Sequence, residues 1–357
     1  MSVLFFARDP GAANVITALF RAFGGEKVLY AKDYARKHLV RFSVPFVDFN
    51  SSVTPQSDLM QGVASVKAWL SGLEGVTAVV TGTADVDDVT DKQIWQAAHE
   101  LSIPTIAVID LAIRTKERFF TKAGELVRPD YVLCPDDTVT KEIAAAQIPR
   151  QCAVTIGRPY LSMLHESREL WLAKRDGVRQ QISDLFSAKF STLVVFASEA
   201  QRAMLDDGEF AEVKALQLAQ QCASEALQDS CFVVKLHPRE RWEDFAGANC
   251  VSTEIDSLDL IAAADIVIGI KSMLLLEAVL LGRPAVSISA WDLEAPAFVS
   301  DSLGLVADAK NSSQLSDWLK TAAYSCPDKR ILDEKLFIEP NWKSVLLSVL
   351  DEARSGV

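Results

Sequence analysis

Short apolar runs alternate with longer amphipathic segments along residues 1–157. The longer segments, such as 12–23 and 90–101, place apolar residues on one face of a helix. The short runs are apolar at nearly every position, which is typical of strands buried on both faces of a parallel sheet. The alternation therefore predicts an α/β domain with helices on both sides of the sheet. We expect its strands at residues 3–7, 27–30, 46–49, 78–82, 105–110 and 131–134.

The pattern changes at residues 158–190, which read as a mostly polar, helical linker, and a second alternating series follows it. Residues 191–330 therefore predict another Rossmann-like domain, and residues 331–357 a helical tail. By analogy with two-domain proteins of this kind, we expect the amphipathic helix at 341–354 to cross back to the first domain. The strands expected in the second series are 191–197, 231–236, 264–270 and 284–289.

The predicted sheets indicate where a ligand would bind. Open parallel sheets bind ligands outside the carboxyl ends of their strands. We therefore expect two Rossmann-like domains that face each other across a cleft, with the functional residues directly after strands.

The composition narrows the class of protein. The chain has 357 residues and a net charge of −12. This charge argues against nucleic-acid binding, because contacts with phosphates need clustered Lys and Arg. No apolar run approaches the ~20 residues that span a bilayer. The N-terminus lacks the basic start and long apolar stretch of a secretory signal, and the six cysteines are scattered. We expect a cytoplasmic protein in a reducing compartment, with at most peripheral membrane contact.

The first candidate site lies in "FFARDPGAANVI", residues 5–16, where a strand ends and a helix begins. Gly11 would let the backbone approach a ligand closely, and the helix start could meet an anion. Asp9 is a carboxylate at the strand's carboxyl end, so it is a candidate general base. The alternative is that Asp9 caps the following turn or helix. The spacing does not match the dinucleotide-binding fingerprint.

A second candidate is Asp110, which ends the expected strand 105–110. It would contact an acceptor or orient another group; capping or a buried hydrogen bond is the alternative. Asp85, Asp87 and Asp88 follow the preceding strand and could suggest a metal ion. A solvated loop explains these three carboxylates better, so we expect no metal.

The third candidate is "KLHPRE", where His237 follows a strand and is followed by Pro238 and Arg239. A histidine there can donate to a phosphate oxygen and stabilise a departing phosphate. Proline fixes the backbone, and arginine adds a planar fork of donors suited to phosphate. The alternative is a histidine whose hydrogen bonds are satisfied within a loop.

"GIKSMLLLEAVLLGRP" is the fourth candidate. The backbone N–H groups after Lys271 and Ser272 open an apolar helix, where they could cradle a phosphate; alternatively, Ser272 is only an N-cap. Glu277 lies in that apolar helix, and a carboxylate there needs a partner. Ribose hydroxyls would serve, and an ion pair with Arg283 is the alternative.

Ser198 and Glu199 follow the first strand of the second series, in "VVFASEAQR". Both side chains could touch a nucleotide or an acceptor. Capping of a turn is equally compatible with their position.

"KLHPRE" and the segment "SLDLIAAADIVIGIKSMLLLEAVLLGRP" resemble the carboxyl-terminal half of GT-B glycosyltransferases. In bacterial sialyltransferases and Kdo transferases, the His-Pro motif and a later serine contact the phosphate of a CMP-sugar; His237 and Ser272 match these positions. CDP-glycerol transferases have a similar His-Pro element. UDP-GlcNAc 2-epimerases share the fold and a helix similar to the one that contains Glu277. The first domain is similar to uncharacterised members of such gene clusters in "IPTIAVID" and "RPDYVLCPDD…IGRP".

Two departures limit the resemblance. The acidic sialyltransferase element that holds the base has a look-alike, "DDGEF" at 206–210, but in the wrong domain. The base is therefore open between Asp9 and Asp110. The paired acidic residues of the epimerases, and their downstream Arg-Pro-Glu stretch, are not evident.

The resemblance implies a metal-independent, inverting glycosyltransferase that needs no cofactor beyond a nucleotide-sugar co-substrate. The first domain would bind a surface-carbohydrate or protein acceptor, and the second the donor, for example a CMP-nonulosonate or CMP-Kdo. The alternatives are a UDP-GlcNAc 2-epimerase-like enzyme, a polyol-phosphate transferase and a non-catalytic nucleotide-sugar-binding assembly subunit. Fold alone does not decide among them.

Overall fold

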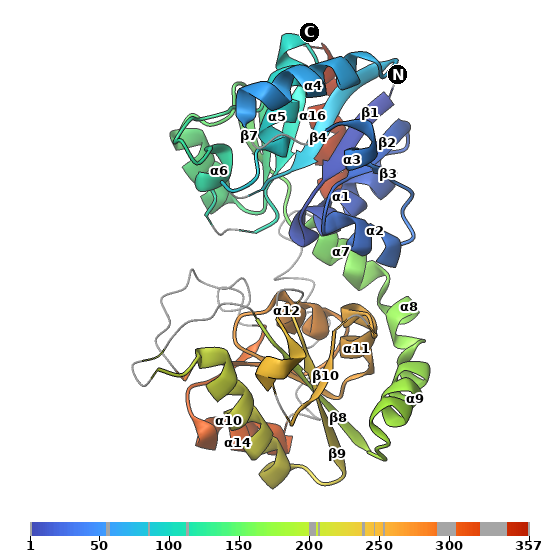
Figure 1. Cartoon of the computed structure of the whole chain (residues 1–357), viewed down its shortest axis with the longest axis vertical. Coiled ribbons are helices and arrows are strands. Elements are labelled where there is room, and N and C mark those ends of the chain that lie inside the picture. The colour runs from blue at the N-terminus through green and yellow to red at the C-terminus, as the bar shows by residue number, and fades with distance from the viewer. Residues whose placement is uncertain are drawn as a thin grey trace. The chain divides into compact units, whose positions relative to one another are not determined.

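In the computed structural model the chain forms two compact units (Figure 1). Unit 1 comprises Met1–Met163 with Phe337–Val357, and unit 2 comprises Leu164–Leu336. The structure describes residues 2–54, 58–84, 86–111, 114–199, 205, 208–237, 240–245, 247–252, 254–290, 305–321 and 341–355.

Unit 1 is built on a seven-stranded parallel sheet of order β3-β2-β1-β4-β5-β6-β7. The chain runs outward from β1 through β2 to β3, then returns to β4 on the other side of β1. The strand order therefore reverses between β1 and β4, which is where ligands bind in open parallel sheets. The strands are β1 (Ser2–Ala7), β2 (Glu26–Ala31), β3 (Val47–Asp48), β4 (Val76–Gly82), β5 (Thr105–Val108), β6 (Tyr131–Cys134) and β7 (Cys152–Thr155).

The helices of unit 1 begin at residues suited to helix starts. Pro10 occupies the first turn of α1, where a missing N–H costs nothing. Asp58 and Asp136 cap α4 and α6 by accepting from backbone N–H groups three residues on, each at 3.0 Å. The helices are α1 (Pro10–Ala22), α2 (Ala35–Arg41), α3 (Phe49–Ser52), α4 (Leu59–Ser71), α5 (Thr90–Glu100), the 3₁₀ turn η1 (Glu117–Phe119), α6 (Asp137–Ala145), α7 (Pro159–Glu166) and α16 (Trp342–Ser355).

Unit 2 repeats this plan with a six-stranded parallel sheet of order β10-β9-β8-β11-β12-β13. Its strand order reverses between β8 and β11. Asp256 caps α11 through Leu258 N at 2.9 Å, and Ser272 caps α12. The strands are β8 (Thr192–Ala197), β9 (Ser230–Lys235), β10 (Asn249–Val251), β11 (Ile266–Gly269), β12 (Ala285–Ile288) and β13 (Ala307–Ala309); the helices are α8 (Arg168–Leu172), α9 (Arg175–Phe186), α10 (Ala211–Ala226), η2 (Trp242–Phe245), α11 (Ser257–Ala263), α12 (Met273–Leu280) and α14 (Ser312–Thr321).

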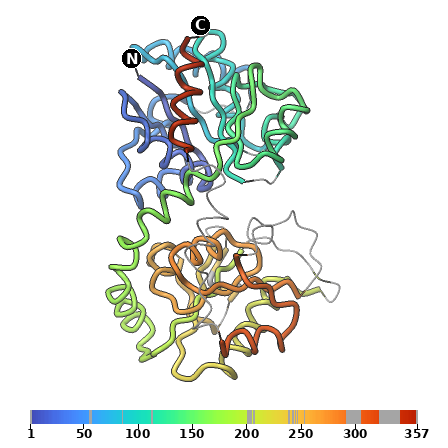
Figure 2. The backbone as a smooth tube through the Cα atoms, turned by 180° about the vertical axis from the view of Figure 1, so that it is seen from behind, coloured from blue at the N-terminus to red at the C-terminus, as the bar shows by residue number. Residues whose placement is uncertain are grey.

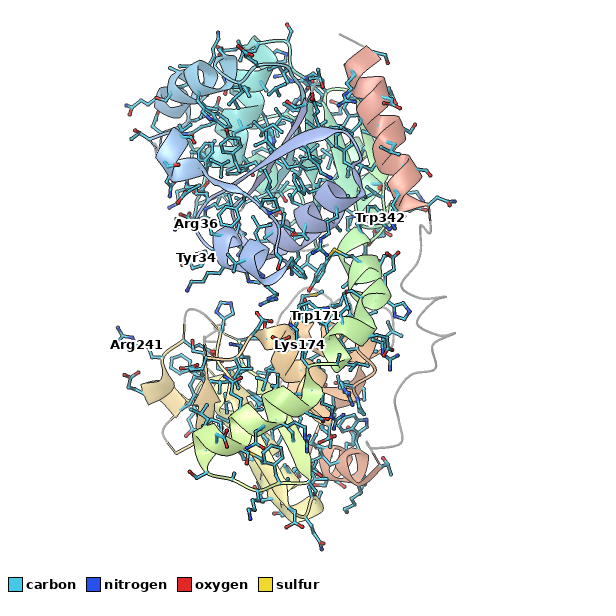
Figure 3. All side chains as sticks on the ribbon, turned by 90° about the vertical axis from the view of Figure 1, so that its right-hand side faces the viewer. Tyr34, Arg36, Trp171, Lys174, Arg241 and Trp342 are labelled. Atoms are coloured by element: carbon cyan, nitrogen blue, oxygen red, sulfur yellow. The ribbon has the colours of Figure 1, made fainter. Side chains whose placement is uncertain are left out.

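A polar helix packs against the start of the central strands of unit 2. Arg175 and Arg179 on α9 both pair with the carboxylate of Asp265, which also accepts from Leu193 N at 2.8 Å. On the preceding segment, Lys174 lies over the ring of Trp171 at 4.5 Å and pairs with Asp259 on α11 (Figure 3). These polar contacts explain why a hydrophilic stretch folds onto the domain.

The last described helix, α16, belongs to unit 1 and lies along its sheet in the back view (Figure 2). It begins at Trp342, labelled in Figure 3, which is buried together with Leu346 and Leu350. Arg354 in its last turn lies over the ring of Phe23 at 5.4 Å, just after α1. Its apolar face is therefore part of the core of unit 1.

The expected fold class, an α/β chain with two Rossmann-like domains, is confirmed. Within it, the expected strand at 46–49 is reduced to Val47–Asp48, because Asp48 accepts from Asn50 N and starts a turn of helix at Phe49. The short strands β7, β10 and β13 were not predicted from the sequence. Among the described residues no helix is long and apolar enough to span a membrane.

Candidate functional site

A pocket in unit 1 lies at the point where the strand order reverses. One wall follows β1 and opens α1; the other follows β4 and leads into α5. Parallel strands bring both loops to the same edge of the sheet. The lining residues are Phe6, Arg8, Asp9, Ala12, Gly82, Thr83, Ala84, Asp88 and Asp91.

Asp9 occupies the N-cap position of α1, but its side chain makes no capping hydrogen bond. Its Oδ1 instead accepts from Arg8 Nη1 at 2.7 Å. Burial raises the pKa of Asp9 to about 6; Arg8 opposes the rise, and neighbouring carboxylates, Asp91 first, add to it. Of the two roles considered for Asp9, capping finds no support, and the carboxyl can exchange a proton near neutral pH.

Arg8 is shared among three carboxylates. While Nη1 reaches Asp9, Nε lies 2.9 Å from Asp88 and 3.1 Å from Asp33. Asp88 also pairs with Lys32 Nζ at 2.9 Å and accepts from Thr90 N at 2.8 Å. Burial acts to raise the pKa of Asp88, but the bonds from Lys32 and Thr90 outweigh it and lower the pKa. This wall of the pocket therefore holds fixed, paired charges.

The adjacent residues Asp91 and Lys92 form a fully buried pair at the start of α5. Asp91 accepts from Ala84 N at 2.7 Å and from Lys92 N at 2.8 Å. Burial raises the pKa of the Asp91 carboxyl, against the effect of Lys92. The pair ties the loop after β4 to the helix that follows it, so it fixes the shape of the pocket wall.

Gly11 and Asp110 lie against each other. A Cβ on Gly11 would come within 1.8 Å of Asp110 Oδ2. Arg118 Nη1 holds the other oxygen of Asp110 at 2.5 Å and donates to Thr83 Oγ1 at 3.0 Å. The next residue, Phe119, is buried and stacks on Trp95, which anchors η1. Gly11 thus makes room for a carboxylate of its own chain, whereas we expected it to make room for a ligand.

The acidic loop after β4 differs from the expected solvated loop. Asp88 is largely buried in the network just described, whereas Asp87 is exposed and pairs with Lys122 at 2.8 Å. Asp85 lies outside the described residues. Within the described part of the chain, no three His, Cys, Asp or Glu side chains are grouped so that they could hold a metal ion.

In unit 2, the strand order reverses between β8 and β11, and Glu199 joins the ends of these strands. Its Oε1 accepts from the backbone N–H of Lys271 at 2.7 Å. Ser272 caps α12 by accepting from Leu274 N at 3.3 Å. The capping alternative for Ser272 is therefore realised, and Glu199 already engages one of the N–H groups expected to meet a phosphate.

His237 lies directly after β9, in a turn closed by Glu240. Glu240 Oε2 accepts from the backbone N–H of His237 at 2.7 Å, and Oε1 accepts from Ser198 Oγ at 2.9 Å. Glu240 thus connects the ends of β8 and β9, which are neighbouring strands. Arg239 lies outside the described residues.

Glu277 is buried in α12, with 3% of its surface exposed. Lys271 and Ser272 precede the same helix. The unit 2 candidates Ser198, Glu199, His237, Lys271 and Ser272 therefore gather at the ends of three adjacent strands, β9, β8 and β11, with Glu277 on the helix that follows.

Seven charged residues that take part in these contacts were not considered in the sequence analysis. Arg8 and Lys92 look like ordinary neighbours of acidic residues, and Arg118 follows a strand by ten residues. Asp91 and Glu240 look like surface carboxylates beside helix and turn signals. The sequence signal for two of them was adjacency to a candidate: Arg8 precedes Asp9, and Glu240 ends the "HPRE" stretch. The seven residues are Arg8, Lys32, Asp33, Asp91, Lys92, Arg118 and Glu240.

No protein-family model matches the sequence, and no curated protein is significantly similar to it. Solved structures do match in fold. UDP-GlcNAc 2-epimerase from Neisseria meningitidis, solved with UDP-GlcNAc, aligns with a TM-score of 0.66 at 15% identity over 99% of this chain and 100% of its own. The Methanocaldococcus jannaschii UDP-GlcNAc 2-epimerase aligns with a TM-score of 0.69 at 12% identity, over 99% and 100%. Anabaena Alr3699/HepE in complex with UDP-glucose aligns with a TM-score of 0.59 at 13% identity, over 100% of both chains.

At these identities the likeness establishes the fold. It extends over both units, so the chain has the two-domain architecture of GT-B-like proteins. The part of the resemblance that concerned this fold is confirmed. What the matched proteins bind and do bears on function only as support for a proposal.

Proposed function

We propose that this protein is an enzyme acting on a nucleotide-activated sugar, and that its reaction is epimerisation at carbon 2 of a UDP-linked N-acetylated hexose. Inversion at carbon 2 breaks its C–H bond and forms it again on the other face of the sugar. Carbon 2 is not next to a carbonyl, so the electron pair of the broken bond would form a double bond to carbon 1 as the nucleotide diphosphate leaves; the diphosphate would return to carbon 1 when a proton is added to the opposite face of carbon 2. The composition of the substrate does not change, so the reaction needs no net oxidant and no second substrate.

The observation that carries this proposal is the Asp9 carboxyl in the unit 1 pocket. Its pKa of about 6 allows both a protonated and an ionised form near neutral pH. A group that must take up and return a proton works best when its pKa lies near the working pH. Asp9 is therefore assigned as the acid–base residue. Asp110, which Arg118 holds, is assigned to sugar binding, and Gly11 shapes the space beside it.

The charges of the pocket favour an uncharged sugar. Arg8, the cation among its lining residues, is already shared by Asp9, Asp33 and Asp88. A nonulosonate or Kdo carries a carboxylate, which would be repelled by Asp9 in its ionised form and by Asp88. A neutral sugar offers hydroxyl and amide groups that carboxylates can accept from. This argument supports a UDP-linked neutral sugar over the CMP-linked donors.

The nucleotide is assigned to the strand ends of unit 2. His237 and Lys271 would supply donors and positive charge to the phosphates, together with the helix start at Ser272. Ser198 and Glu199 would shape the floor, and Glu277 would accept from the ribose. The predicted contribution of Arg239 remains part of this proposal. Full-length likeness to two UDP-GlcNAc 2-epimerases supports the assignment.

Glycosyl transfer is the second candidate, and the His-Pro element with Ser272 favours it. In that reaction Asp9 would deprotonate an acceptor hydroxyl of a surface carbohydrate or protein, and His237 would stabilise the leaving phosphate. The structure of HepE with UDP-glucose, on the same fold, is compatible with it. The same residues would act, so the products must decide.

The deciding experiment incubates the protein in D₂O with UDP-GlcNAc, UDP-glucose and a CMP-sugar, and follows each by NMR. Epimerisation gives a 2-epimer, with deuterium at carbon 2 and the nucleotide still attached. Transfer or donor hydrolysis releases the nucleotide without such exchange. Binding of a nucleotide sugar without any turnover would overturn both enzyme proposals and favour an assembly subunit. Asp9→Asn should lower turnover by about 10²–10⁴-fold, the scale of losing one acid–base group.

A further inference from the structure

We propose that Asp88 is a positioning residue for Asp9: together with Asp33, which accepts the Nε hydrogen bond, its carboxylate holds the Nε side of Arg8, so that Arg8 reaches the Asp9 carboxyl through Nη1. The inference rests on the proposed function only in giving the Asp9 proton a use. The arrangement itself is a property of unit 1.

An arginine and a carboxylate form their strongest pair when two N–H groups meet two oxygens. Arg8 does not offer Asp9 that pair. Its contact with Asp9 is Nη1 to Oδ1 at 2.7 Å, while its Nε lies 2.9 Å from Asp88 Oδ2. The hydrogen bond of the same Nε is accepted by Asp33 at 3.1 Å, and Asp88, which is the less exposed carboxylate, pairs with Nε by charge.

Asp88 is well placed to keep its hold on Arg8. Its Oδ2 also meets Lys32 Nζ at 2.9 Å, and its Oδ1 accepts from Thr90 N at 2.8 Å. Lys32 is itself bonded to Thr90 Oγ1 at 2.7 Å. Lys32 and the backbone N–H of Thr90 therefore fix the Asp88 carboxylate on the loop that enters α5, independently of Asp9.

Charge counting shows what this hold does. Arg8 and Lys32 are balanced by Asp33 and Asp88, so the cluster is neutral when Asp9 carries its proton. Ionised Asp9 then adds an unbalanced negative charge to a partly buried pocket.

Two further carboxyl groups act on Asp9 in the same direction: Asp91 at the start of α5, and Asp110 after β5, itself paired with Arg118. The largest charge effects on the Asp9 carboxyl thus come from Arg8, which lowers its pKa, and from Asp91, Asp88 and Asp110, which raise it. The pKa of the Asp9 carboxyl depends on how closely Arg8 pairs with it, and Asp88 limits that pairing.

The test is a direct titration of Asp9 by ¹³C NMR on protein labelled at aspartate carboxyl carbons, with the Asp9 signal assigned by its loss in Asp9→Asn. Asp88→Asn removes the competing charge, while its side-chain oxygen can still accept from Thr90. We expect the Asp9 midpoint to fall by about one pH unit, the scale of one neighbouring charge. Lys32→Gln leaves Asp88 with Arg8 alone, so we expect the midpoint to rise. Loss of packing alone would not move it in opposite directions.

Asp87→Asn is the matched control, because Asp87 is adjacent, exposed and paired with Lys122. It should leave the midpoint unchanged. Asp88→Glu keeps the charge and should keep the midpoint near its wild-type value. The proposal is overturned if Asp88→Asn leaves the midpoint in place or raises it, or if Asp88→Glu lowers it equally. The titration of Asp9 does not require turnover. An inactive protein would therefore contradict the proposed function, while this inference would still be tested by the titration midpoints.

Discussion

Gly11 and Asp110 occupy adjoining space at the start of α1: a Cβ on Gly11 would come within 1.8 Å of Asp110 Oδ2. Gly11→Ala should therefore displace a carboxylate that Arg118 holds in place. We expect a loss of about 1–3 kcal/mol in the free energy of unfolding, the usual range for overpacking.

The matched control is Gly177→Ala in α9, where an added Cβ meets nothing within 4 Å. It should be neutral or stabilise the helix by up to about 1 kcal/mol. In the double variant Gly11→Ala/Asp110→Ala the clash is removed, so the two effects should be less than additive in urea unfolding. Full additivity would mean that the two residues do not interact.

Asp9 should make the stability of the protein depend on pH. A carboxyl whose pKa is raised in the folded state stabilises that state only while it is protonated. This contribution is complete below the ordinary aspartate pKa and is lost as the pH rises through about 6. Asp9→Asn should therefore be more stable than the wild type at pH 8, by up to about 2 kcal/mol after a discount for the 31% exposure of the side chain.

The measurement is denaturant unfolding of Asp9→Asn and wild type at pH 4, 6 and 8. The difference should be small at pH 4 and grow towards pH 8. A variant that is equally or less stable at pH 8 would contradict the raised pKa. Greater stability combined with lost turnover would indicate a group kept for chemistry.

Asp265 should show the opposite pH dependence. Burial acts to raise its pKa, but the hydrogen bond from Leu193 N and the contacts with Arg179 and Arg175 outweigh burial and lower it. A carboxyl with a lowered folded-state pKa stabilises the protein above its ordinary pKa, and this stability is lost as the pH falls through the folded-state value. Asp265→Asn should cost about 2–4 kcal/mol at pH 7, because it leaves two arginines without their shared partner.

Asp184→Asn is the control for Asp265, since Asp184 is exposed on α9 and accepts from Gln180 Nε2 at 2.7 Å. It should change the free energy of unfolding by no more than about 0.5 kcal/mol. The Asp265→Asn difference should shrink below pH 4. A difference that is independent of pH would assign the loss to packing.

His237→Ala should lower turnover of the nucleotide sugar by about 10²-fold or more, the scale of losing one donor to a developing charge. His99→Ala, an exposed histidine at the end of α5, is the control and should leave turnover unchanged. A near-normal rate for His237→Ala would remove His237 from the mechanism. An unchanged kcat with a raised KM would mean that His237 binds the substrate and the transition state equally.

The sequence predicted where several candidate residues lie in the fold, but not which residues they contact. Asp9, Asp110, Glu199 and Lys271 were found because they follow strands, and parallel strands bring their carboxyl ends to one edge. Their partners could not be found in that way. Arg8 meets Asp88 because β1 and β4 are neighbours in the sheet, a pairing that local periodicity does not determine.

The same limit explains why the contact of Gly11 and the burial of Asp91 and Lys92 were not predicted. Gly11 in a turn suggests space for a ligand, and only the tertiary structure shows Asp110 filling that space. Asp91 and Lys92 together look like an exposed helix start, yet both are buried. Buried charge is rare enough that a sequence pattern favours the exposed interpretation.

The helix α16 has a consequence for how the chain matures. Unit 1 is assembled from residues at both ends of the sequence, with all of unit 2 inserted between them. During synthesis the β1–β7 sheet is made before unit 2, yet the apolar strip that Leu346 and Leu350 cover stays bare until α16 has been made after it. Unit 2 can close while its neighbour is still unfinished. Unit 1 thus begins before unit 2 and is completed after it, and a chain stopped short of α16 should be a target for chaperones and proteases.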